Sequence, residues 1–277
     1  MEKYIGKIIN GDCIEVMSEM PINSVDLIVT SPPYGVGIAY DVHDDDVVFE
    51  EYLKFTTQWL TQAYQILKDD GRIAINIPYE INRQDKGGRI FFCSEVYQVM
   101  KRIGYKFFGI VDLEEDSPHR SKTTAWGSWM SPSSPYIYNP KECVILAYKH
   151  KHIKTVKGEP QWKGTPTEIE QEDGTVKKKV VYEDTDKKEF MELVFGQWKY
   201  FADTKSLTKA IKILSYKNDI ILDPFAGSGT SMVAAEILDR RWIGIELSPD
   251  YTEIARNRVQ TLIDQKKQQE LEFEKPQ

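Results

Sequence analysis

Apolar residues follow two alternating patterns along the chain. Seven short runs rich in Ile, Val and Phe have the length of single strands: residues 7–10, 25–30, 72–77, 107–113, 143–148, 220–223 and 242–247. Such nearly continuous runs are typical of strands covered on both faces. Between several of them, apolar residues recur at helical spacing, over residues 47–67, 90–103, 230–238 and 250–264. The alternation predicts an α/β fold with a doubly wound, mostly parallel, seven-stranded sheet.

Three stretches interrupt this alternation. Residues 117–140 are rich in Pro, Ser, Trp and Tyr and predict a long ordered loop. Residues 149–190 are highly charged and carry turn signals at 157–160 and 172–174, which predicts an element inserted into the core fold. The polar tail at 265–277 is expected to fray. One domain, formed by residues 1–148 and 191–264, would therefore flank an insertion.

Length and charge narrow the class of protein. With 277 residues and 41% apolar content, the chain can bury a substantial core. No apolar run approaches the roughly 20 residues that cross a bilayer, and the first ten residues lack a signal-peptide pattern, so we expect a cytoplasmic protein without membrane contact. The net charge of −7 argues against an indiscriminate nucleic-acid binder. Basic clusters at 83–89, 119–122 and 149–157 are, taken alone, typical of solvated surfaces.

The cysteines and histidines predict neither disulfides nor a metal site. Cys13, Cys93 and Cys143 are far apart in sequence and form no CxxC pair. His150 and His152 are close, but no third or fourth ligand lies near them in the sequence. We expect reduced, mostly buried thiols.

A first candidate site follows the predicted strand at 220–223. There the chain enters a glycine-bearing turn and then a helix: Asp223, Pro224, Phe225, Ala226, Gly227, Ser228, Gly229 and Thr230. A strand-to-helix turn without a ligand would also explain this pattern. However, Glu246 ends the next strand, where a carboxylate can accept both hydroxyls of a ribose. Because Met232 stands where a third glycine would complete GxGxxG, a nucleoside without a pyrophosphate is favoured over NAD.

A second candidate site follows the strand at 25–30. Ser31, Pro32, Pro33 and Tyr34 come directly after this strand. Prolines donate no backbone hydrogen bond and fix their own backbone, which leaves nearby carbonyls free to accept. A rigid acceptor loop followed by an aromatic ring suits a flat base with an amino group. The alternative is a proline-rich turn with a core tyrosine.

These motifs occur together with two others, NGDCIEVM at 10–17 and WGSWMSP at 126–132. In this order, with VDLIVTSPPYG before ILDPFAGSGT and IGIEL, the chain resembles the β-class DNA amino-methyltransferases over nearly its whole length. The resemblance implies the methyltransferase fold with S-adenosyl-L-methionine as cofactor. It also implies a catalytic part at 1–148, a target-recognition element at 149–190 and a cofactor-binding part at 191–264.

The resemblance assigns roles to individual residues. The loop from Asp223 to Thr230 would line the methionine and adenosine parts of the cofactor, Glu246 would bind the ribose, and Asp12 and Cys13 would contact the adenine. Lys205 could face the cofactor carboxylate, although the prolines that the family places around this position are absent. Ser31, Pro32, Pro33 and Tyr34 would hold the target base.

The resemblance further implies methylation of an exocyclic amine on a base flipped out of double-stranded DNA. Ser31 favours N4 of cytosine, because the family's adenine-N6 enzymes commonly carry Asp or Asn there. The alternatives are adenine-N6 methylation, methylation of RNA or of a protein amide, which the motif order disfavours, and a non-catalytic DNA-binding subunit. A prokaryotic or phage origin, a homodimer and a cognate restriction endonuclease or modification-complex subunit are further expectations. The loop at 117–140 and the insertion at 149–190 are the candidates for reading DNA.

Overall fold

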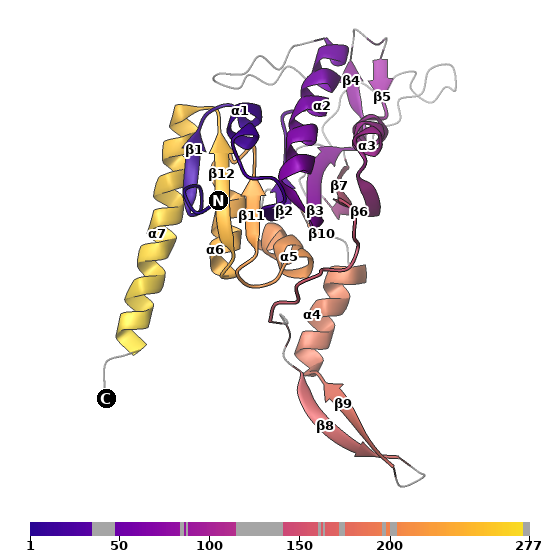
Figure 1. Cartoon of the computed structure of the whole chain (residues 1–277), viewed down its shortest axis with the longest axis vertical. Helices are drawn as coiled ribbons and strands as arrows, with labels where there is room; N and C mark the ends of the chain where they lie inside the picture. The colour runs from indigo at the N-terminus through magenta and orange to yellow at the C-terminus, as the bar shows by residue number, and fades with distance from the viewer. Residues whose placement is uncertain are drawn as a thin grey trace, which may run out of the picture.

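A computed structural model describes residues 1–34, 48–83, 86, 88–114, 141–159, 162, 164–171, 175–195, 198–199 and 204–273. Its centre is a sheet in the order β1-β12-β11-β2-β3-β7-β6-β10 (Figure 1). The strands are β1 (Lys7–Asn10), β2 (Val25–Thr30), β3 (Leu67–Pro78), β6 (Lys106–Glu114), β7 (Glu142–Tyr148), β10 (Trp198–Lys199), β11 (Ile220–Asp223) and β12 (Arg241–Glu246).

The sheet confirms the predicted fold class. All seven predicted runs form strands in it, and the two-residue β10 adds an eighth at the edge beside β6. Neighbouring strands are parallel except at β7, which pairs antiparallel with both β3 and β6. Every residue of β2 is buried, which explains why this run is apolar throughout most of its length.

Helices cover both faces of the sheet. One face packs against α1 (Cys13–Ser18), α2 (Phe49–Ile66) and α3 (Phe92–Ile103), with Trp59, Phe92 and Met100 fully buried. The other packs against α5 (Thr204–Leu214), α6 (Thr230–Ile237) and α7 (Pro249–Phe273). Two short hairpins lie outside the sheet, formed by β4 (Ile81–Arg83) with β5 (Gly88–Ile90), and by β8 (Thr165–Glu170) with β9 (Val176–Val181).

The sequence predicted that the chain frays from residue 265. This prediction was wrong for residues 265–273, because α7 continues to Phe273. Residues 265–271 contain strong helix formers and neither Gly nor Pro, which favours continuation of the helix. Lys266 Nζ also donates to the Glu236 carbonyl on α6 at 2.7 Å. No helix among the described residues is long and apolar enough to cross a membrane.

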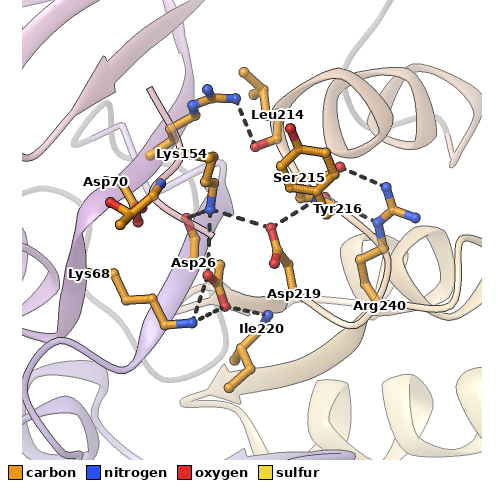
Figure 2. A network of polar contacts seen from close by, with 12 residues as sticks. Asp26, Lys68, Asp70, Lys154, Leu214, Ser215, Tyr216, Asp219, Ile220 and Arg240 are labelled. Carbon is orange, nitrogen blue, oxygen red and sulfur yellow. Dashed lines mark hydrogen bonds and ion pairs between the residues drawn. The ribbon is translucent and has the colours of Figure 1, made fainter. Parts of the chain in front are cut away.

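The inserted segment is anchored where the parallel strands begin. Lys154 is 7% exposed, and its Nζ lies 3.5 Å from Asp26 Oδ1 and 3.3 Å from Asp219 Oδ2 (Figure 2). Asp26 is the second residue of β2, and Asp219 directly precedes β11. From this anchor, β8, β9 and α4 (Asp184–Phe195) extend away from the sheet, on the side opposite α1 (Figure 1). The boundary predicted at residue 190 falls inside α4.

Candidate functional site

A cavity of ≈ 450 Å³ opens at the carboxyl ends of β1, β2, β11 and β12. This is the edge of an open parallel sheet at which ligands bind. Its lining comes from both predicted sites and from their neighbours: Gly11, Asp12, Cys13, Ser31, Pro33, Phe55, Pro224, Phe225, Gly227, Glu246, Leu247, Ser248 and Tyr251. The two predicted sites, far apart in the chain, are therefore one site.

A buried carboxylate joins the two halves of this site. Thr30 Oγ1, at the end of β2, donates to Asp223 Oδ1 at 2.7 Å, and the Phe225 amide donates to the same oxygen at 3.0 Å. Ser231 in α6 donates to the other oxygen. Burial raises the pKa of Asp223 to about 6, although these hydrogen bonds oppose the shift. Asp223 thus stabilises the loop at residues 223–230 through hydrogen bonds from the protein side and does not line the cavity.

Glu246 is held with its carboxylate at the cavity wall. Its Oε2 accepts from the Gly227 amide at 2.7 Å, and its Oε1 accepts from the Ser248 amide at 2.9 Å. Each carboxylate oxygen can accept more than one hydrogen bond, so both retain capacity for hydroxyl donors. This geometry fits two neighbouring ribose hydroxyls.

The glycine loop is built for close packing. Gly229 has φ +82°, and a Cβ there would lie 2.9 Å from Ala255 Cβ on α7. The amides of Phe225, Ala226, Gly227 and Gly229 all donate to acceptors within the protein. A pyrophosphate would need such amides free. The loop therefore suits a nucleoside, as the missing third glycine predicted.

The opposite wall begins where β1 ends. Asp12 caps α1 by accepting from the Ile14 and Glu15 amides at 2.8 and 3.1 Å, which fixes the position of Cys13. Burial raises the pKa of the Cys13 thiol well above its ordinary value, and the Asp12 carboxylate adds to the rise. Cys13 is thus a neutral, packed thiol suited to contact an apolar ring. All three cysteines are free and buried, as predicted.

Polar side chains converge beside the loop that follows β2. Ser31 Oγ and Tyr34 Oη lie 3.0 Å apart. Asn76 Nδ2, on β3, donates to Tyr34 Oη at 3.0 Å and to Glu142 Oε2 at 2.9 Å, and lies 3.4 Å from Ser31 Oγ. The Tyr34 ring stands edge-on to Phe92, with centroids 6.4 Å apart. Ser31 therefore lines the cavity, and Tyr34 lies beside it in contact with the Ser31 hydroxyl.

The arrangement of Ser31 and Glu246 around one cavity agrees with the comparison to known families. The family model for N6 and N4 methyltransferases, described as DNA methylase, matches residues 25–257. This chain belongs to that family. The type II methyltransferase M.MjaVI of Methanocaldococcus jannaschii is 37% identical to this methylase over 198 residues, which cover 72% of this chain and 87% of the relative. M.HpaI of Haemophilus parainfluenzae is 27% identical over 273 residues, covering 91% and 74%.

Solved structures share the fold of this methylase. TTHA0409 of Thermus thermophilus, complexed with S-adenosyl-L-methionine, has a TM-score of 0.67 at 22% identity and covers 91% of this chain and 92% of its own. The cytosine-N4-specific PvuII DNA methyltransferase has a TM-score of 0.59 at 17% identity, covering 91% and 88%. At these identities the likeness establishes the shared α/β architecture.

Several residues assigned to the site lie beside the cavity and not in its wall. Pro32 and Ala226 are buried. Ser228 and Thr230 instead accept hydrogen bonds from Arg258 Nη1 on α7, at 3.2 and 2.9 Å. Lys205 lies in α5, but its side chain is outside the described part of the structure, as are Gly35 and the motif at 126–132.

The structure also adds residues that the sequence did not indicate. Gly11, Phe55, Leu247, Ser248 and Tyr251 complete the cavity wall. Phe55 stands edge-on to Phe225, with ring centroids 6.0 Å apart, so α2 supports the glycine loop. A polar residue inside an otherwise apolar strand, Asn76 between Ile75 and Ile77, was the one available signal for the cluster at Ser31.

Proposed function

We propose that this methylase transfers a methyl group from S-adenosyl-L-methionine to N4 of a cytosine flipped out of duplex DNA. One observation carries this proposal: the Ser31 hydroxyl, a neutral acceptor, lines the same cavity as the Glu246 carboxylate. A nucleoside cofactor and a target amine can thus meet in one space. The type II names of the relatives support a role in restriction and modification.

The described residues fit the cofactor. Glu246 would accept from the ribose hydroxyls, and Asp12 and Cys13 would lie against the adenine, with Phe55 and Tyr251 as further walls. Among the described lining residues no side chain is cationic, which leaves Lys205 as the candidate partner of the methionine carboxylate. When bound, the cofactor supplies an electrophilic methyl group on a sulfonium.

The chain's own residues would activate the amine. The lone pair of an exocyclic amine is delocalised into the base, which makes the amine a poor nucleophile. If Ser31 Oγ and the Pro32 carbonyl accept its two hydrogens, the nitrogen can direct its lone pair at the methyl carbon. With the cofactor bound, methyl transfer would give the amine a new N–C bond in exchange for the methyl–sulfur bond, and the amine would release one proton to solvent. Positioning supplies most of the acceleration.

Extrusion of the target nucleotide from the duplex would bring its exocyclic amine within reach of Ser31. Extrusion costs on the order of a few kcal/mol in lost stacking. Stacking on the Tyr34 ring would recover roughly 1 to 3 kcal/mol. The target-recognition roles of 149–190 and 117–140, like the homodimer and the partner endonuclease, stay predictions.

The proposal is tested by product analysis. Purified protein is incubated with unmethylated bacterial DNA and methyl-labelled S-adenosyl-L-methionine, and the DNA is digested to nucleosides for mass spectrometry. We expect label in N4-methylcytosine. Label in N6-methyladenine would keep the chemistry but overturn the base, and label in neither nucleoside would favour a non-catalytic subunit.

Two serine variants extend this test to the site. Ser31→Ala removes the proposed acceptor and should abolish most labelling while cofactor affinity stays unchanged. Ser24→Ala removes a similar hydroxyl, bonded to the Pro21 carbonyl away from the cavity, and should label like the unaltered protein. Full labelling by Ser31→Ala would remove Ser31 from the mechanism.

A further inference from the structure

Two buried polar residues, Asn76 and Glu142, lie behind the loop that follows β2, each next to an apolar run of its strand. Asn76 is 4% exposed on β3 and Glu142 is 6% exposed at the start of the antiparallel neighbour β7. Burying an amide and a carboxyl costs free energy unless both are hydrogen-bonded. Since apolar residues fill the surrounding positions, the pair needs an explanation beyond packing.

Glu142 sets the orientation of the Asn76 amide. The amide turns its NH₂ group toward Glu142, because Nδ2, which can only donate, lies 2.9 Å from Glu142 Oε2 and donates to it. Flipping the amide would place its oxygen against the carboxylate and create repulsion in a buried site. Among the residues that the structure describes, Asn76 Oδ1 has no hydrogen-bond partner, so the NH₂ side holds the amide in place.

The oriented amide then holds the groups that would contact the base. Its nitrogen donates to Tyr34 Oη at 3.0 Å and lies 3.4 Å from Ser31 Oγ. Because Nδ2 can only donate, Ser31 and Tyr34 meet it with their oxygen lone pairs. Phe92 contacts the Tyr34 ring, so the side chain is fixed at its ring and at its hydroxyl. Ser31 is exposed and depends on this cluster for a fixed rotamer.

We infer that Asn76 and Glu142 are positioning residues of the methyl-transfer site. Glu142 orients Asn76, and Asn76 holds the Ser31 hydroxyl and the Tyr34 ring in the arrangement that receives the target base. This inference rests on the proposed function. It predicts an effect on turnover and not on cofactor binding, because neither residue lines the cofactor cavity.

The test removes both partners together, as Asn76→Leu with Glu142→Leu. Replacing both residues by apolar residues of similar size removes the buried amide and the buried carboxyl together, so folding should be retained. We expect kcat to fall roughly tenfold, equivalent to about 1.36 kcal/mol of activation free energy. The Kd for S-adenosyl-L-methionine should stay unchanged. The single variant Glu142→Gln keeps Asn76 and retains an acceptor for its amide. It should therefore keep most of the kcat of the unaltered protein.

A double-mutant cycle separates positioning from a general structural effect. In a Tyr34→Phe background the hydroxyl that Asn76 holds is gone, so the Leu pair should lower kcat by much less than in the unaltered protein. Tyr105→Phe is the matched control, because it removes a buried hydrogen bond to the Leu60 carbonyl away from the site. It should lower the melting temperature and leave kcat unchanged.

The outcomes distinguish this inference from the proposed function. An unaltered protein that labels no cytosine or adenine amine would overturn the proposed function. An unaltered kcat in the Leu pair, or a fall in kcat that is equal in both backgrounds, would overturn the positioning role alone. A crystal structure of the Leu pair gives a readout independent of activity. Ser31 and Tyr34 should be displaced, and an unchanged Ser31–Tyr34 contact would also overturn the inference.

Discussion

Carboxylates that hold the site together differ in whether they face the cavity or the interior. Glu246 keeps both oxygens at the cavity wall, whereas Asp223 is enclosed and serves only donors of the protein. Residue type alone does not separate these roles. Two variants that exchange a carboxylate for an amide test them.

Glu246→Gln should weaken cofactor binding. The amide nitrogen of Gln cannot accept, so one acceptor is lost for both the loop amides and the ribose hydroxyls. We expect the Kd for S-adenosyl-L-methionine to rise at least tenfold, the effect of losing about 1.4 kcal/mol, as measured by titration calorimetry. Glu236→Gln is the matched control, because Glu236 accepts from Trp242 Nε1 away from the cavity. Equal affinities in both variants would remove Glu246 from the cofactor site.

Asp223→Asn should change how stability depends on pH. Burial raises the pKa of Asp223 from 3.8 to about 6. The folded state thus binds this proton more tightly than the unfolded chain, and the group's contribution to the free energy of unfolding falls as pH rises from about 4 to about 6. The free energy of unfolding of the variant lacks this fall. The difference in free energy of unfolding, variant minus unaltered protein, should therefore rise by on the order of 3 kcal/mol across that pH window. Denaturant unfolding at several pH values measures this difference, and parallel curves would contradict it.

Among the elements, the segment after β7 is fixed by charges buried beneath the sheet. Lys154 contacts Asp26 and Asp219, while Asp26 also accepts from Lys68 and from the Ile220 amide (Figure 2). Lys149 Nζ donates to the Leu67 carbonyl at 2.8 Å. These contacts join the segment to β2, β3 and β11 at their amino ends.

Lys154→Met should destabilise the protein through this anchor. Asp26 would keep its contact with Lys68, but Asp219 would lose its contact with the Lys154 ammonium, and removing one member of a buried ion pair typically costs about 3 kcal/mol. We expect a clearly lower melting temperature by calorimetry. Lys178→Met is the control, because its ion pair with Glu168 is exposed and such pairs contribute little. Equal melting temperatures for the two variants would show that the buried contacts do not stabilise the anchor.

At the scale of the whole molecule, the hairpin and α4 extend away from the sheet on the side opposite α1 (Figure 1), whereas the cavity opens at the carboxyl ends of the parallel strands, where Cys13 of α1 lines it. Residues 164–195 contain nine Asp and Glu against five Lys, a balance that disfavours binding to phosphates. Neither observation supports the prediction that this part reads the bases beside the flipped nucleotide.

Replacing residues 165–182 by a short Gly/Ser linker tests this point. Thr165 pairs with Val181 across the hairpin, so its ends are close enough for a short linker to join them. We expect the methylated DNA sequence and the kcat/KM for DNA to stay the same. Loss of sequence specificity with intact cofactor binding would instead establish the element as the target reader.

The sequence alone determined the strands, their order of occurrence and the two loops of the site. These features are local: a strand buried on both faces reads as an apolar run, and a loop at its end carries its own glycines or prolines. The Ser31 and Glu246 sites therefore followed from short motifs. The proposed mechanism and the proposed base preference rest on the family resemblance that those motifs carry.

Only the tertiary structure decided which distant residues meet. Asn76 and Glu142 lie 66 positions apart, and Thr30 and Asp223 lie 193 apart. Each pair comes together because of strand order and register, which no local pattern specifies. The insertion is a similar case. Its composition indicated a separate element, but the contacts of Lys154 with Asp26 and Asp219 fixed the end of the strands from which the insertion extends. Side chains that act through burial depend on which strands become neighbours, and that is a property of the folded chain.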